Sequence, residues 1–149
     1  MRVVVVRSQQ ELDACLMIRH EVFIVEQRVP EDLEVDEWDQ LCTDVTHVLM
    51  YDDLQYPVAT ARLKPYQVDS VKIQRVAVRR SHRRQGYGRL IMRALEDIAK
   101  DNHYRKIILD AQCHAQKFYE QLYYQKSGDR FVEAGIEHIH MEKMLKRTE

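Results

Sequence analysis

The stretch that most constrains the fold runs from Val71 to Asn102, where an apolar run leads into a basic loop with two glycines and then into an amphipathic segment. The amphipathic segment predicts a helix, because apolar residues recur along one face with the period of 3.6 residues. These residues are Leu90, Ile91, Ala94, Leu95, Ile98 and Ala99. Asn102 is a typical residue at which such a helix ends. The stretch therefore predicts a strand, a turn and a helix in succession.

The loop between this strand and helix is suited to bind an anion. Gly86 and Gly88 let the backbone approach a ligand without a Cβ in the way. The first amides of a helix lack partners within it and carry the positive end of its dipole, so a diphosphate is a natural ligand. Five arginines in segment 79–89 add positive charge. A solvated basic loop is the alternative, and the strand–loop–helix context makes it the weaker one. The glycine spacing matches neither GxxxxGK[ST] nor GxGxxG, which argues against ATP and NAD.

Composition indicates a globular chain that we assign to a single domain, residues 1–149. With 23 basic and 24 acidic residues, the formal net charge is −1, which argues against a dedicated nucleic-acid binder. The charges are uneven along the chain, because segment 21–44 is acidic and segment 75–89 is basic. We therefore expect two sites of opposite sign.

The cysteines and the apolar runs indicate a cytoplasmic protein without a membrane partner. Cys15, Cys42 and Cys113 are odd in number and widely spaced, which predicts neither a disulfide framework nor a zinc ribbon. The valine run near the N-terminus is too short for the core of a signal peptide. No apolar run approaches the roughly 18 residues that a membrane span needs.

The remaining segments predict an α/β fold with a mixed sheet and helices on both of its faces. We expect strands at 2–6, 46–51, 58–63, 71–78, 106–111, 131–132 and 136–145, with Pro65 ending the third. Helices are expected from the capping-box sequence at 8–11, at 90–102, and from Ala115 to about Ser127. The continuous apolar run at 106–111 is typical of a parallel strand, which implies a right-handed crossover.

Two segments leave alternatives open. The alternation of apolar residues slips near Arg75, as either a β-bulge or burial on both faces would cause. Segment 30–44 is acidic around Trp38 and reads as a loop with one short helix. It is either a solvated surface or a rim that attracts a cationic amine.

Arg83-x-x-Gly86-x-Gly88 resembles the [QR]-x-x-G-x-[GA] signature of the GNAT superfamily of N-acetyltransferases. Further segments resemble its ElaA-like branch, in the same order along the chain: 19–27, 34–36, His47, 109–119 and 131–141. The resemblance implies a mixed, mostly antiparallel sheet with a crossover helix between its fourth and fifth strands. It also implies that these central strands splay apart.

The resemblance implies a site for acetyl-CoA and chemistry without a metal. The bulged strand would offer backbone groups to the pantetheine arm, and the glycine loop would wrap the pyrophosphate. The implied cofactor-binding residues are Val76, Ala77, Val78, Arg83, Arg84, Gln85, Gly86, Tyr87, Gly88, Arg89, Gln112 and Phe118. Because the resemblance implies chemistry without a metal, it disfavours a metal site built from His138, His140, Cys113 and His114.

Tyr119 matches the helix tyrosine that protonates the departing thiolate in many superfamily members. A tyrosine with a pKa of about 10 is protonated at pH 7 and can donate to a thiolate whose conjugate acid has a pKa of about 8.5. The acceptor amine must also lose a proton. Glu26, Asp36, His47 and His138 are candidate bases that no spacing distinguishes, and we take His138 forward with Tyr119 as catalytic residues.

The predicted function is transfer of an acetyl group from acetyl-CoA directly to a small-molecule or protein amine. A catalytically silent CoA-binding regulatory module is the alternative, and a nucleic-acid surface is a third, weaker reading. Cys113 as a nucleophile is less favoured than a small buried cysteine. Tyr123-Tyr124 stands where many relatives have Gly-Phe, which predicts a later helix end, and Glu137 replaces a common proline. A homodimer is compatible with the resemblance.

Overall fold

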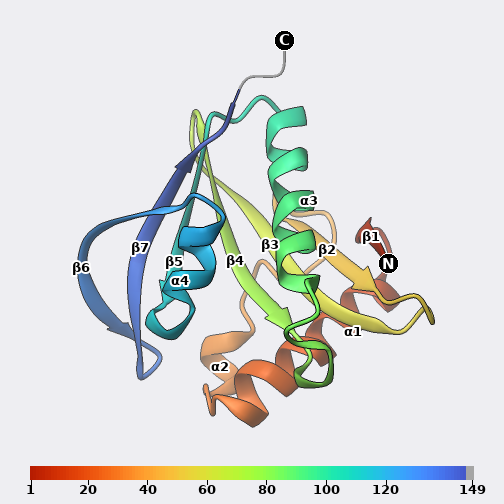
Figure 1. The fold of residues 1–149 in the computed structure, drawn as a ribbon. Helices are drawn as coiled ribbons and strands as arrows, with labels where there is room; N and C mark the ends of the chain where they lie inside the picture. Colours follow the sequence, from red (N-terminus) through yellow and green to blue (C-terminus); the bar gives the residue numbers. More distant parts are fainter. Residues whose placement is uncertain (147–149) are drawn as a thin grey trace.

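The structure is a computed structural model that describes residues 1–146, and in this part of the chain seven strands form one sheet in the order β1-β2-β3-β4-β5-β7-β6 (Figure 1). The strands are β1 (Arg2–Val5), β2 (Thr46–Tyr51), β3 (Pro57–Gln67), β4 (Ser70–Val78), β5 (Lys106–Gln112), β6 (Gln125–Glu133) and β7 (Ile136–Met144). Neighbouring strands are antiparallel except for β4 and β5, which are parallel. The assignment of residues 1–149 to one domain stays a prediction.

Helical segments connect the strands. They are α1 (Gln9–Arg19), the π-helix η1 (His20–Glu26), α2 (Glu31–Glu34), the 3₁₀ turn η2 (Arg80–His82), α3 (Tyr87–Asp101), the 3₁₀ turn η3 (Cys113–Ala115) and α4 (Gln116–Gln121). β4 and β5 are parallel and α3 connects them, which confirms the parallel strand predicted from the continuous apolar run.

The two central strands separate along their length. β5 pairs only with Ser70–Ile73 of β4, whereas β4 continues beside β3 as far as Val78. Figure 1 shows β4 and β5 diverging beyond this point. The predicted splay is confirmed, and it opens the sheet at its centre.

A β-bulge interrupts β4 at the beginning of the splay. Thr60 pairs with Ala77 and Arg62 pairs with Gln74, so two residues of β4 lie opposite one residue of β3. Arg75, one of the two, has a φ of 57°. The phase slip in the sequence is therefore a bulge, and not the trace of a strand buried on both faces.

Helices cover both faces of the sheet, as predicted. Ile91, Met92 and Leu95 of α3 are fully buried in the larger core cluster, which also contains Val48 of β2. Leu49, the next residue of β2, belongs to a second cluster with Cys15 and Ile18 of α1. Successive strand residues point to opposite faces, so α1 and α3 pack on opposite sides of the sheet.

The first helix widens into a π-helix. The predicted capping box is present, because Ser8 and Glu11 bond reciprocally to each other's backbone amides. Beyond Arg19 the chain forms η1, and the amide of Gln27 donates to the carbonyl of Val22 at 3.2 Å. The loss of helical period at 22–27 in the sequence thus marks a change of helix type.

Three predicted boundaries are wrong. β3 passes through Pro65 to Gln67, because β2 begins opposite Leu63, so that Pro65 lies in a part of β3 with a neighbouring strand on one side only, where a proline is tolerated. α4 ends at Gln121 instead of near Ser127, and β6 begins at Gln125 instead of at residue 131.

The tyrosine pair explains the early end of α4. Tyr123 has a φ of 73°, which reverses the chain, and Tyr124 is 2% exposed in the core. The Tyr124 hydroxyl donates to Glu96 of α3 at 2.8 Å. The prediction that Tyr123-Tyr124 prolongs the helix is therefore wrong, because Tyr124 has to enter the core.

Candidate active site

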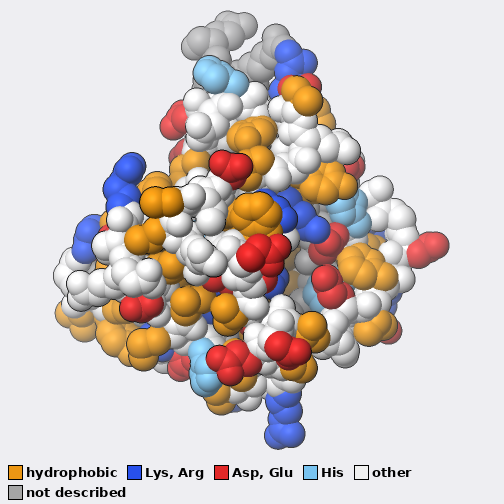
Figure 2. Space-filling view, turned by 180° about the vertical axis from the view of Figure 1, so that it is seen from behind, with side chains coloured by type: hydrophobic (Ala, Val, Ile, Leu, Met, Phe, Trp, Pro, Cys, Tyr) orange, Lys and Arg blue, Asp and Glu red, His pale blue; other side chains and the backbone are white. Residues whose placement is uncertain are grey.

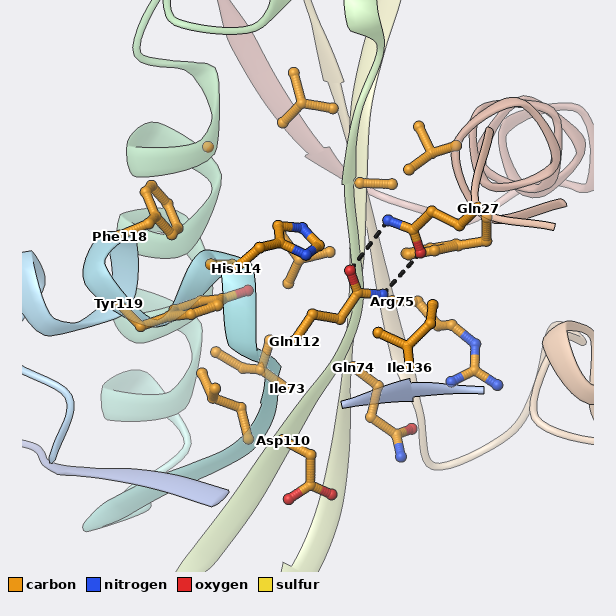
Figure 3. A pocket seen from close by; sticks show the side chains of 18 of the residues that line it. Gln27, Ile73, Gln74, Arg75, Asp110, Gln112, His114, Phe118, Tyr119 and Ile136 are labelled. Atoms are coloured by element: carbon orange, nitrogen blue, oxygen red, sulfur yellow. Dashed lines mark hydrogen bonds between the residues drawn. The ribbon is translucent and has the colours of Figure 1, made fainter. Parts of the chain in front are cut away.

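A pocket of about 820 Å³ occupies the opening between β4 and β5 (Figure 3). Every predicted site residue lines it except Gln85. Those that do are Val76, Ala77, Val78, Arg83, Arg84, Gly86, Tyr87, Gly88, Arg89, Gln112, Phe118, Tyr119 and His138. Residues that are far apart in the sequence thus meet in one cavity.

The glycine loop brings the N-terminus of α3 to this pocket. Gly86 precedes the helix with a φ of 88°, in the left-handed region that glycine adopts easily, and no side chain caps the helix end. The first helix amide with a partner in the helix is that of Leu90, which donates to Gly86. The amides of the first turn are therefore free to bind an anion.

The loop arginines fall into two groups. Arg83 forms a bidentate ion pair with Glu26 at 2.8 and 2.9 Å, and Arg79 pairs with Glu21. No described residue forms an ion pair with Arg84 or Arg89, both of which are exposed at the pocket. These two arginines are the ones available to an incoming polyanion.

The second glycine of the motif serves packing. A Cβ at Gly88 would lie 3.2 Å from Cζ of Phe118, so the missing side chain lets α3 approach α4 closely. A Cβ at Gly86 would meet nothing within 4 Å. The two glycines are thus required for different reasons: Gly86 for its backbone angle and Gly88 for a helix contact.

Tyr87 and Gln85 support the loop from within. The Tyr87 ring is 8% exposed in the core and contacts the His82 ring edge-on, with 5.7 Å between centroids. The Gln85 amide donates to the carbonyl of Ser81 at 3.3 Å, which holds its side chain within the loop.

The backbone of β4 is partly available to a ligand. No strand lies beside Gln74–Val78 on the β5 side, since the parallel pairing stops at Ile73. The carbonyl of Val78, however, already accepts a hydrogen bond from Nε of Arg83 at 3.0 Å. The free backbone groups next to the bulge are therefore those of the residues before Val78.

Tyr119 points its hydroxyl into the pocket (Figure 3). The ring packs edge-on between those of Phe118 and Tyr124, at centroid distances of 5.0 and 5.9 Å. Burial raises the pKa of the Tyr119 hydroxyl, which keeps the group protonated at neutral pH. No side chain of residues 1–146 forms a hydrogen bond with this hydroxyl. In the same part of the chain, every polar side-chain atom that is fully buried has a hydrogen-bond partner. The hydroxyl is therefore free to donate to a ligand.

Of the four candidate bases, His138 alone lines the pocket. Its Nδ1 donates to the carbonyl of Ile136 at 2.7 Å, and Phe131 stacks on its ring, which leaves Nε2 to accept a proton. Glu26 is engaged by Arg83 and Asp36 by Arg62, through contacts of 2.9 Å or less. His47 bonds to the carbonyl of Trp38 away from the pocket, and burial lowers its pKa.

The acidic segment is solvated in part, because Glu31, Asp32, Glu37 and Asp44 are exposed. Three of its carboxylates turn inward onto three arginines in a nearly buried network: Glu34, Asp36 and Asp39 with Arg19, Arg62 and Arg75. The charges of this network balance. On the face shown in Figure 2, acidic and basic side chains are interspersed and do not form a patch of one sign. The interpretation as a solvated surface thus holds for four of the seven carboxylates, the partners of the other three lie on α1, β3 and β4, and the rim for a cationic amine stays a prediction.

Gln27 is a pocket residue to which the sequence assigned no role. Its side chain forms two reciprocal hydrogen bonds with that of Gln112, at 3.1 and 2.8 Å. Arg75 is another, and it donates to the carbonyls of Leu33 and Glu34. The position of Gln27 next to Glu26, in a segment that resembles the family, could have pointed to it. The phase slip in β4 could have pointed to Arg75.

Comparison with known proteins identifies the family. The sequence model of the family described as "Acetyltransferase (GNAT) domain" matches residues 7–145. The chain belongs to the GNAT acetyltransferase family. It is 35% identical over 144 residues to the N-acetyltransferase YjcF of Bacillus subtilis, covering 96% of this chain and 99% of that protein.

Two solved structures have a fold similar to that of this chain. An acyl-CoA N-acyltransferase from Pseudomonas aeruginosa is 30% identical, with a TM-score of 0.81 over 96% of this chain and 99% of that one. Escherichia coli ElaA is 28% identical, with a TM-score of 0.83 over 95% and 98%. The resemblance to the ElaA-like branch is thereby confirmed, and the family identifies this GNAT protein as an acyltransferase. None of its described helices has the length and apolar character of a membrane span.

Proposed function

We propose that this GNAT protein transfers the acetyl group of acetyl-CoA directly to an amine. The observation that carries the proposal is that one pocket joins an uncapped helix N-terminus, flanked by two unpaired arginines, to the free hydroxyl of Tyr119. The first feature suits a pyrophosphate and the second suits a leaving thiolate. The relative from Pseudomonas is itself named an acyl-CoA N-acyltransferase.

The residues present fit coenzyme A. The amides at the start of α3, with Arg84 and Arg89, hold the pyrophosphate, and the unpaired backbone of β4 before Val78 binds the pantetheine amides. Bound acetyl-CoA supplies a thioester carbonyl that an amine can attack. Phe118 forms an apolar wall beside the loop.

Tyr119 acts as the general acid. The amine nitrogen bonds to the acetyl carbon, the carbon–sulfur bond breaks, and the sulfur takes the hydroxyl proton of Tyr119. The new amide nitrogen then gives up its surplus proton, which restores the Tyr119 hydroxyl. The burial that raises the pKa of Tyr119 also raises that of a thiol held beside it, so the two pKa values shift in the same direction.

His138 accepts the proton that the ammonium form of the acceptor must lose. An alkylammonium with a pKa of about 10.4 is almost fully charged at pH 7, so a base is needed before attack. Nε2 of His138 is the acceptor that its hydrogen bond to Ile136 leaves open. The acceptor itself is a small-molecule or protein amine.

The decisive experiment compares Tyr119→Phe with the wild type. We expect kcat for acetyl transfer to fall by about 10²–10⁴-fold, while calorimetry gives the same Kd for coenzyme A. Tyr123→Phe is the matched control, because Tyr123 is 81% exposed. Full turnover by Tyr119→Phe would exclude the general-acid role. Coenzyme A binding by a wild type that acetylates no amine would favour the silent regulatory module.

A second experiment tests the cofactor loop. Gly86→Val should weaken coenzyme A binding, because a β-branched residue resists the φ of 88° that aims the loop amides. Unchanged binding would exclude this loop as the pyrophosphate site.

A further inference from the structure

Gln27 and Gln112 form a cyclic amide pair at the pocket. Nε2 of Gln27 donates to Oε1 of Gln112 at 3.1 Å, and Nε2 of Gln112 donates to Oε1 of Gln27 at 2.8 Å. Both side chains are partly buried and line the cavity. Turning both amides over leaves the same pair, so the contact does not depend on how oxygen and nitrogen were assigned.

The pair joins the two sides of the open sheet. Gln112 ends β5, and Gln27 directly follows η1, which contacts β4. In Figure 3 the two side chains reach toward each other, with Tyr119 on the opposite side of Gln112 from Gln27. The pair therefore lies where β4 and β5 have separated, in the same pocket as Tyr119, the proposed acid for the thiolate of the thioester.

The end of η1 is held on its other side as well. Glu26, the neighbour of Gln27, pairs with Arg83 of the glycine loop. Two consecutive residues thus contact the two sides of the cofactor site, Glu26 the glycine loop and Gln27 the end of β5. The backbone N–H of Gln27 also donates to the carbonyl of Val22, so both its backbone and its side chain are held.

Each amide keeps hydrogen-bonding capacity for a ligand. A primary amide has two N–H donors and a carbonyl oxygen with two lone pairs. The cyclic pair uses one donor and one lone pair on each side chain, which leaves one N–H and one lone pair on each. A thioester carbonyl needs a donor and an attacking amine needs an acceptor, so the pair offers both without carrying a charge.

We propose that Gln27 is a positioning residue for the transfer step, which fixes the amide of Gln112 so that its remaining N–H meets the acyl carbonyl. The inference rests on the proposed acetyl transfer. Gln27 acts through Gln112, and a donor held in advance costs no reorganisation when charge develops on the carbonyl oxygen. A glutamate at position 27 would accept from Gln112 and would have no proton to donate in return.

The test uses Gln27→Met, which keeps the length of the side chain and removes both hydrogen bonds. We expect kcat to fall by about 10- to 100-fold, because small misplacements of positioned groups have effects of this size. The KM for acetyl-CoA and the unfolding midpoint in urea should stay close to those of the wild type. Gln27→Glu should show an intermediate kcat. Gln125→Met, in an exposed strand, is the control.

A double-mutant cycle separates positioning from a simple structural tie. If Gln27 acts through Gln112, Gln27→Met/Gln112→Met should lose no more kcat than Gln112→Met alone. The inference would be overturned if the reductions in kcat of the two single variants multiplied in the double variant, or if Gln27→Met kept the kcat of an active wild type. Either result would leave the proposed transfer intact. A wild type without transfer to any amine would overturn both.

Discussion

Arg19 donates to both carboxylate oxygens of Asp39, at 2.6 and 2.9 Å, and each of the two side chains is 1% exposed. Arg62 adds a third donor to Asp39 at 3.0 Å. Burial alone would raise the pKa of Asp39, but the bonds and charge of Arg19 outweigh it and lower this pKa to about 2. Asp39 therefore anchors the acidic segment to α1 and β3.

Asp39→Asn should lower the free energy of unfolding by about 3–5 kcal/mol, since it leaves two buried guanidinium groups without their shared carboxylate. Urea denaturation measures the loss. Asp44→Asn, an exposed change in the same segment, should alter the unfolding free energy by less than about 0.5 kcal/mol. Equal losses in the two variants would contradict an anchoring role.

Acid should destabilise the wild type through the same group. The folded pKa of Asp39 lies below its unfolded value of about 3.9, so its contribution is present above pH 4 and disappears as the pH falls through 2. Asp36 and Asp110, whose pKa values are also lowered, add to the effect despite the opposing influence of burial. The unfolding free energy of Asp39→Asn, followed by urea titration at each pH, should fall less steeply in this range.

Glu26→Gln should tighten coenzyme A binding by about three- to tenfold, if the proposed site is correct. The change releases Arg83 from its bidentate partner and removes a negative charge near the polyphosphate, although partial exposure of Arg83 limits the gain. Calorimetry at low and high salt measures it, and the gain should shrink as salt rises. Glu37→Gln, at an exposed glutamate, is the control. Weaker binding by Glu26→Gln would mean that the ion pair shapes the loop for its ligand.

Gly88→Ala should be rescued by Phe118→Leu, whereas Gly86→Ala should not. The Cβ at position 88 meets Phe118 at 3.2 Å, and a smaller side chain removes that contact. Alanine then stabilises the helix by up to about 1 kcal/mol relative to glycine. At position 86 the φ of 88° imposes a cost of about 1–2 kcal/mol that no neighbour can relieve. The test measures the unfolding midpoints of the four proteins that carry Gly or Ala at position 88 with Phe or Leu at position 118. An equal rescue of Gly86→Ala by Phe118→Leu would contradict the prediction.

Local patterns in the sequence predict most of the fold. The amphipathic period of α3, the capping box of α1 and the apolar run of β5 depend on residues close in the chain, and the structure confirms all three. The glycine loop follows from the same reasoning, because a helix N-terminus offers its amides whatever packs around it. The ligand-binding and catalytic roles assigned to individual residues stay predictions.

Long-range partners explain what sequence reasoning missed. Gln27 and Gln112 are 85 positions apart, and the carboxylate of Asp36 meets Arg62 across 26. No periodicity records such pairs, so the sequence showed neither that part of the acidic segment faces buried arginines nor that Gln27 pairs with Gln112. The end of α4 was misplaced for a related reason, because the burial of Tyr124 depends on Glu96 of another helix.

The π-helix gives segment 20–26 some freedom in length as well as in composition. A π-helix bonds each amide one residue further back than an α-helix does, so η1 accommodates a residue that an α-helix would not need. Deleting one residue would let ordinary helical bonding return, and because the wider turns absorb the extra residue, the chain on either side would keep close to its present orientation. Glu26 and Gln27 would then still face the cofactor loop and β5. Natural variation in this segment should therefore include single-residue deletions that convert η1 into an α-helix, as well as substitutions.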